Sequence, residues 1–187
     1  DRQIADDHMA RDHMIRDLNM TLEYKENGNS VARIPVAPSI FNNRGAVQAG
    51  VLATLVDLAS GALSARAVYP DLSVTGDLRM YSTKPAKTGE VAAVGSVLRT
   101  GRSTVVVKTE IMTGTTGATT TIGSGIATFY KLSRRDGNIA MVKDVISNEA
   151  TTFKADGPGL SEHLLERAGL RVVDEATGVV ELDISAY

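Results

Sequence analysis

The stretch that decides the fold is Asn42 to Asp57, which reads NNRGAVQAGVLATLVD. A polar turn containing Gly45 runs directly into apolar residues with helical spacing, and this run carries one carboxylate, Asp57. Burying an ionised carboxylate among apolar residues is costly unless hydrogen bonds or opposite charges compensate for it. Asp57 therefore either faces solvent on a narrow polar stripe or is held at a functional site.

The neighbours of Asp57 favour a functional site over an ordinary surface ion pair. No Lys or Arg stands four residues before or after it, and from Ala46 to Ala67 the only other charged residue is Arg66. The sequence predicts a mostly buried helix from about Ala46 to Val68, stopped by Pro70.

The segments around this helix read mainly as strands. Before it we expect an amphipathic helix at 4–18 and a hairpin formed by 20–24 and 31–36. After it, four segments rich in β-branched residues are separated by turns: 72–82, 89–99, 103–113 and 119–132. The pattern predicts an α+β fold in which an antiparallel meander and the hairpin form one sheet that wraps around one long central helix.

Composition excludes several function classes. The net charge of −2 and the isoelectric point near 5.9 argue against a nucleic-acid-binding protein. The chain has no Cys, and its three His lack zinc-ligand spacing, so we expect no metal and no cofactor. We expect no apolar run to reach bilayer length, and the first residues are too polar for a signal peptide, which predicts a cytoplasmic protein without a membrane partner.

Several spacings together resemble a known family. They are Asn42, Gly45, Gln48-Ala49-Gly50 and Leu55-Val56-Asp57, followed by VTGDL at 74–78, KPAKTG at 84–89 and LRTGRS at 98–103. This set resembles the hotdog-fold acyl-CoA thioesterases of the phenylacetate-pathway (PaaI) type, over roughly residues 13 to 132. The resemblance implies a homodimer or tetramer with the active site at the subunit interface.

The resemblance also implies roles for individual residues. Asp57 would activate water or attack the thioester directly, and the sequence leaves both mechanisms open. The N–H groups of Ala49 and Gly50, at the start of the helix, would form the oxyanion hole. Thr75 would reach across from the facing subunit to position the attacking water.

Three residues differ from the family pattern or have a simpler explanation. Gln48 and Ala49 stand where the family usually has His and Gly, and a Gln amide can donate a hydrogen bond but cannot carry a proton. Gln48 either supports catalysis or only bonds the backbone at the helix start. Asn42 likewise either orients the substrate or carboxylate, or only forms the turn.

Basic residues stand at two strand ends. Arg99, Arg102 and Ser103 surround one glycine turn, and Lys84 stands in another. Most such charges only solvate turns, but in the resembled family these loops lie near the nucleotide end of coenzyme A, so the four residues are candidate substrate-binding residues.

The end of the chain repeats its beginning. Setting His163 beneath His13 aligns HMIRDLNMTLEYKENG with HLLERAGLRVVDEATG, and after a two-residue gap VARIPV with VVELDI. We therefore expect a hotdog domain at 1–132, a connector at 133–159 and a partial repeat of the first helix and hairpin at 160–187. The repeat is either truncated or vestigial, and it would pack on the first domain or on a partner chain.

Two functions of different classes follow from these residues. The favoured one is an acyl-CoA thioesterase that acts as a homo-oligomer. The alternative is a non-catalytic module that binds acyl-CoA or an acyl carrier, in which the missing His at position 48 reflects lost chemistry.

Overall fold

The structure is a computed structural model that describes residues 14–115, 118–133, 150–152 and 160–183. Four helical segments lie in these ranges: α2 (Met14–Asp17), the 3-10 turn η1 (Pro38–Ile40), α3 (Ala49–Val68) and α4 (Leu164–Arg167). The strands are β1 (Thr21–Tyr24), β2 (Ser30–Pro35), β3 (Leu72–Ser82), β4 (Glu90–Thr100), β5 (Thr104–Thr115), β6 (Ala118–Leu132), β7 (Thr151–Thr152), β8 (Leu170–Asp174) and β9 (Val179–Leu182). Most of the expected first helix and of the connector lies outside the described residues.

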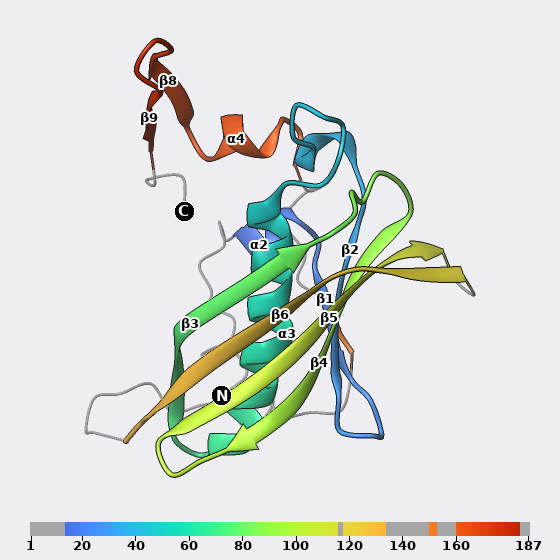
Figure 1. The fold of residues 1–187 in the computed structure, drawn as a ribbon, viewed down its shortest axis with the longest axis vertical. Helices are drawn as coiled ribbons and strands as arrows, with labels where there is room; N and C mark the ends of the chain where they lie inside the picture. The colour runs from blue at the N-terminus through green and yellow to red at the C-terminus, as the bar shows by residue number, and fades with distance from the viewer. Residues whose placement is uncertain (1–13, 116–117, 134–149, 153–159, 184–187) are drawn as a thin grey trace.

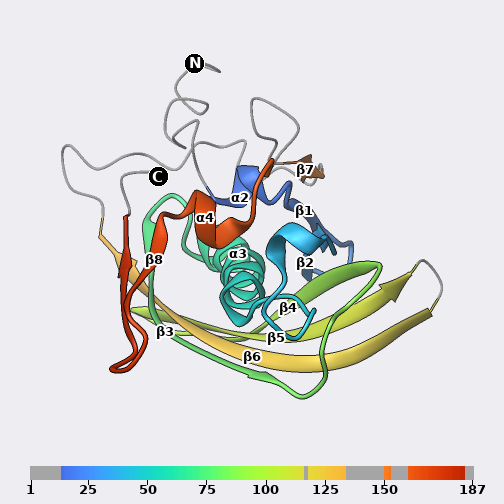
Figure 2. The ribbon, with the colours of Figure 1, turned by 90° about the horizontal axis from the view of Figure 1, so that it is seen from above.

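One long sheet wraps around α3, as the sequence predicts (Figures 1 and 2). The strand order is β3-β6-β5-β4-β2-β1-β7, and every described pair is antiparallel. The expected four-stranded meander is only partly right, because β4, β5 and β6 form a meander while β3 pairs with β6 instead of β4. The chain therefore crosses over between β3 and β4, and this leaves β3 as an edge strand.

Helix α3 begins at Ala49, three residues later than expected. The preceding backbone is extended because its N–H groups bond elsewhere: Val47 N donates to Ala86 O at 2.9 Å and Gln48 N to Ile40 O at 3.0 Å. The helix ends at Val68, two residues before Pro70, because the residue before a proline disfavours helical geometry.

Small residues allow α3 to lie close to the sheet. A Cβ at Gly125 of β6 would lie 2.8 Å from Val56 Cγ1, and a Cβ at Gly95 of β4 would lie 2.6 Å from Ser30 Oγ. That Ser30 hydroxyl, which is buried, donates a 2.6 Å hydrogen bond to the carbonyl oxygen of Ala59 in α3. Glycine at these two positions therefore sets how closely helix and sheet approach.

Helix α3 also changes one expectation about membranes. By length and composition it is apolar enough to cross a bilayer, so the expectation that no run reaches that length is wrong. Most of the apolar stretch is buried against the sheet, as in the central helix of a folded domain.

The last described segment has the same local structure as the first. In each, a short helix is followed by a residue with positive φ, Asn19 (49°) or Gly169 (65°), and then by a hairpin. The hairpin pairs Thr21 with Arg33 in the first segment and Arg171 with Glu181 in the second, which are matching positions of the aligned sequences. The second hairpin stands apart from the main sheet as a separate two-stranded sheet (Figure 1).

Candidate functional site

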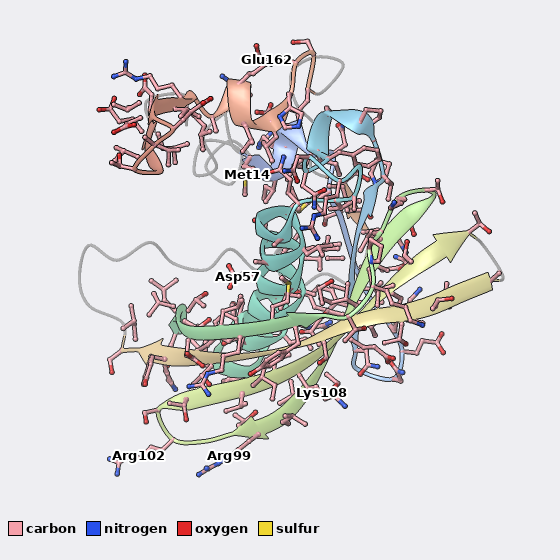
Figure 3. The ribbon with its side chains drawn as sticks, turned by 45° about the horizontal axis from the view of Figure 1, so that its top comes forward. Met14, Asp57, Arg99, Arg102, Lys108 and Glu162 are labelled. Carbon is pink, nitrogen blue, oxygen red and sulfur yellow. The ribbon has the colours of Figure 1, made fainter. Side chains whose placement is uncertain are left out.

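Asp57 lies on the flank of α3 that faces the edge strand β3. Its side chain is half-buried, and Oδ1 accepts a 2.9 Å hydrogen bond from the Thr75 hydroxyl. Within the described chain no hydrogen bond reaches Oδ2. Figure 3 shows Asp57 projecting from the side of α3 away from β1 and β2. The carboxylate is thus oriented through one oxygen, while the other remains available for chemistry.

Thr75 reaches Asp57 from the same chain, where the resemblance implied a Thr75 from the facing subunit. The pairing of β3 with β6 shifts register between Thr75 and Asp77, which marks a bulge next to the carboxylate. Bulges redirect side chains, and they are common beside functional sites. One chain therefore supplies both the acid and the hydroxyl that orients it.

The start of α3 presents free N–H groups. Gln48, the N-cap residue, is extended (φ −63°, ψ 145°), and its side chain makes no capping hydrogen bond to the helix. Ala49 and Gly50 follow it and are exposed. Their N–H groups have no carbonyl one turn earlier in the helix, and the helix dipole adds partial positive charge there. This end of α3 can therefore stabilise an oxyanion.

A pocket of about 290 Å³ adjoins this end of the helix. Its walls come from the turn before α3, the first turn of α3 and the end of β3 with its following turn: Asn42, Ala46, Val47, Ala49, Leu52, Ser82, Thr83, Lys84, Pro85 and Ala86. The structure thus brings together Asn42, Ala49 and Lys84, three of the residues expected at the site. Sequence reasoning treated the 84–89 segment as a turn between strands, with Lys84 as a candidate phosphate contact. It missed that buried Ala86 anchors this segment to Val47.

The side chains of Asn42 and Gln48 bond the backbone. Asn42 Oδ1 accepts from Arg44 N at 2.9 Å and Ala46 N at 3.3 Å, which is the turn-forming arrangement. Gln48 Nε2 donates to Phe41 O at 3.3 Å. Both residues therefore shape the turn that leads into α3, and Asn42 makes no hydrogen bond to Asp57.

Asp57 and the helix N-terminus are too far apart in one chain to act on the same thioester. Asp57 follows Ala49 by eight residues, about 12 Å along a helix at ~1.5 Å per residue. A thioester carbon and its oxygen must each lie about 3 Å from the groups that act on them. Within a single chain, the Asp57 carboxylate and the N–H groups at the start of α3 therefore lie too far apart to act together.

The basic turn lies at the other end of the molecule. Arg99 lies near the end of β4, and Arg102 and Ser103 lie in the β4–β5 turn. Figure 3 shows Arg99 and Arg102 projecting far from Asp57. All three are exposed and none lines the 290 Å³ pocket. Within one chain, these three residues therefore do not lie beside the candidate site residues around α3.

A larger cavity of about 730 Å³ lies beside the hairpin turn and the last turns of α3. The Arg66 guanidinium stacks on the Tyr24 ring at 4.0 Å from its centroid, and the Tyr24 hydroxyl donates to Ala62 O at 3.2 Å. Burial raises the pKa of Tyr24 above its usual value, and the nearby Arg66 charge opposes part of that rise.

Among the described residues, no three His, Asp or Glu side chains gather as metal ligands.

Comparison with known proteins identifies the central segment. Residues 45–119 match the model of the thioesterase superfamily. This segment contains Ala49, Asp57, Thr75 and the β4–β5 turn. None of the curated proteins matches the sequence.

Solved structures match between 61% and 70% of the chain. A Bacillus halodurans protein crystallised with CoA is 28% identical, with a TM-score of 0.54, and the match covers 61% of this chain and 74% of that one. A conserved protein of Pseudomonas aeruginosa is 26% identical with a TM-score of 0.54, covering 62% and 90%. A thioesterase family protein of Silicibacter pomeroyi, 22% identical with a TM-score of 0.59 over 70% and 97%, shares the fold. The chain is therefore a hotdog-fold protein whose residues 45–119 match the thioesterase superfamily.

Proposed function

We propose that this protein hydrolyses acyl-CoA thioesters, with water and the thioester giving a free acid and coenzyme A. The observation that carries the proposal is the Asp57 carboxylate, oriented through Oδ1 by Thr75 and open at Oδ2. The match to the thioesterase superfamily and the likeness to a protein crystallised with CoA support it. The motif spacing from Asn42 to Asp57 supports the finer assignment to the phenylacetate-pathway type.

Two mechanisms fit the carboxylate. Asp57 Oδ2 either takes a proton from water as the water attacks the thioester carbon, or attacks that carbon itself to form an anhydride that water then opens. In both, the thioester oxygen becomes negative and the Ala49 and Gly50 N–H groups stabilise it. The CoA thiolate leaves and takes up a proton.

We infer that the complete site forms between two copies of the chain. The separation of about 12 Å between Asp57 and Ala49 along one helix calls for the helix N-terminus of a facing copy. In the described chain β3 is an edge strand of 11 residues with one side unpaired. Such an edge favours pairing with another strand, and β3 carries Thr75 next to the acid. A two-fold dimer that pairs these edges brings the two Asp57 flanks towards each other.

The basic turn fits the same assembly. Arg102 lies far from the Asp57 of its own chain, and Ser103 follows it in the same turn, so a facing or neighbouring copy would supply them to the phosphates of CoA. Arg102→Ala should raise the KM for an acyl-CoA about tenfold but leave the KM for the matching acyl-pantetheine, which lacks the nucleotide, unchanged. Lys108→Ala, at an exposed basic residue on β5, is the matched control.

Hydrolysis of a panel of acyl-CoAs, followed by thiol release, tests the proposal. Asp57→Asn retains an oxygen for Thr75 but removes the base, and should lower kcat at least about 100-fold, as should Asp57→Ala. Glu26→Gln, at an exposed acid in the β1–β2 turn, should retain the wild-type rate. Equal rates in wild type and both Asp57 variants would sink the hydrolase proposal.

A non-catalytic acyl-CoA-binding module remains the second candidate. The observation that favours it is that the Gln48 amide, at the position of the family's His, bonds the Phe41 carbonyl. Under this alternative, wild type and Asp57→Ala bind a non-hydrolysable acyl-CoA thioether with equal Kd and neither releases thiol.

A further inference from the structure

Helix α4, from the repeated segment, is attached directly to the turn that leads into α3. Leu164 is buried in the main core cluster, which Phe41 and Leu160 also contact. At its start, the His163 ring lies with Nε2 2.8 Å from the carbonyl oxygen of Phe41. At its end, Arg167 Nε lies 3.1 Å from Asp17 Oδ2 in α2. Apolar and polar contacts therefore both attach the helix to the domain.

The hydrogen bonds of His163 define its tautomer. Its Nδ1 lies 3.3 Å from the backbone N of Leu165, a group that only donates, so Nδ1 must be the unprotonated nitrogen. The proton of the neutral ring is then on Nε2, where the Phe41 carbonyl accepts it. One imidazole thus caps α4 and also holds a carbonyl in another part of the chain.

The Phe41 carbonyl is also the acceptor of the Gln48 side chain, at 3.3 Å. Gln48 is the N-cap residue of α3, and its own carbonyl accepts from Leu52 N at 3.2 Å. A carbonyl oxygen has two lone pairs, so His163 and Gln48 can both donate to it. The order of contacts is therefore His163 to Phe41, Phe41 to Gln48, and Gln48 to the first turn of α3.

We propose that His163 is a positioning residue for the candidate site, acting through the Phe41 carbonyl on Gln48 and the N–H groups that follow it. It holds the Phe41 to Gln48 turn in the geometry in which Ala49 and Gly50 present their N–H groups. This proposal rests on the proposed function for its effect on catalysis, but its effect on the turn is independent of any activity.

Substitutions at His163 separate its two hydrogen bonds. His163→Asn retains an oxygen at the Nδ1 position, which caps α4 well, but loses the donor to Phe41. His163→Gln places an amide donor near the Nε2 position and lacks the cap. His163→Ala loses both. Arg167→Ala, at the opposite end of α4, is the matched control because it loosens the same helix from α2 instead.

Hydrogen exchange of the intact chain is the direct test. His163→Asn and His163→Ala should raise exchange in residues 38–48 about three- to tenfold, His163→Gln should stay near wild type, and Arg167→Ala should affect 14–19 instead. In an active enzyme kcat should fall by a similar factor in the first two variants, with KM nearly unchanged. Wild-type exchange at 38–48 in His163→Asn would overturn the proposal. If the wild type hydrolyses nothing, exchange still decides this proposal while the proposed function fails.

Discussion

The Thr75 hydroxyl donates a 2.9 Å hydrogen bond to Asp57 Oδ1, across eighteen residues of sequence. The bond joins the edge strand to the central helix and fixes which carboxylate oxygen is free. A carboxylate whose orientation is held in advance loses less entropy when it reaches the transition state. This pair is the part of the site that one chain completes by itself.

Replacing Thr75 with Val should remove the bond without changing the shape of the strand. We expect kcat to fall about three- to tenfold, the effect of one ordinary hydrogen bond, while KM changes little. Thr75→Ser retains the hydroxyl and should retain most of the rate. Thr120→Val, at an exposed threonine on β6, controls for a general effect of the substitution. An unchanged kcat in Thr75→Val would show that the hydroxyl does not assist the carboxylate.

Proline at the start of α3 tests the oxyanion hole without breaking the helix. Ala49 is the first helical residue, where proline is favoured and the lost N–H has no partner in the helix. The extended Gln48 backbone also suits a following proline. One of the variants Ala49→Pro and Gly50→Pro removes the N–H that faces the oxyanion. That variant should lower kcat about 100-fold, with an unchanged circular dichroism spectrum. Ala49→Gly retains the N–H and serves as the control. If both proline variants retain the full rate, neither N–H stabilises the oxyanion.

The close approach of α3 and β6 predicts a coupled pair of stability effects. Gly125→Ala places a methyl group 2.8 Å from Val56 Cγ1 and should lower the free energy of unfolding by about 1–3 kcal/mol. In a Val56→Ala background the same change should cost less, because the clashing methyl group is gone. Urea titrations of the wild type, the two single variants and the double variant give the coupling energy between positions 56 and 125. Equal costs in both backgrounds would mean that the clash lies elsewhere.

Tyr24 should make the fold sensitive to alkaline pH. Burial raises its pKa above the usual 10.0 in the folded state, so the folded protein holds this proton more tightly than the unfolded chain does. The resulting stability is complete below about pH 10 and is lost as pH rises through the folded pKa. Tyr24→Phe should be less stable at pH 7, because the bond to Ala62 is lost, and should flatten the decline above pH 10. Parallel curves for both proteins above pH 10 would contradict this assignment.

The fold was predictable from the sequence because its signals are local and strong. The apolar run around Asp57, the stop at Pro70 and the turns between the later strands predict α3 and the strands that wrap it. The position of β3 beside β6 was not predictable, since strand order depends on how the sheet closes around the helix. Likewise, the later start of α3 depends on a bond from Val47 to Ala86, a contact that no local pattern reveals.

The site was predictable only in part, for the same reason. The sequence singled out Asn42, Ala49 and Lys84, which line one pocket at the start of α3, and Asp57, which lies on the flank of the helix; their roles stay predictions. Sequence reasoning noted His163 only as a repeat of His13, and its bond to Phe41 joins residues 122 positions apart.

The partial repeat of the first helix and hairpin at the end of the chain stays a prediction. The valines and leucine of β8 and β9 are about half exposed, whereas the matching Leu22, Ala32 and Ile34 are buried, so we expect a further apolar surface to cover the second hairpin.

In the proposed dimer, Asp57 of one chain and the N-terminus of α3 of the facing chain act on one thioester. The most direct test is to co-refold Asp57→Ala with whichever of Ala49→Pro and Gly50→Pro is nearly inactive alone. Random pairing makes half the dimers mixed, and each mixed dimer has one intact site of two, so we expect about a quarter of the wild-type rate. Mixed dimers that form but recover no activity would contradict the claim.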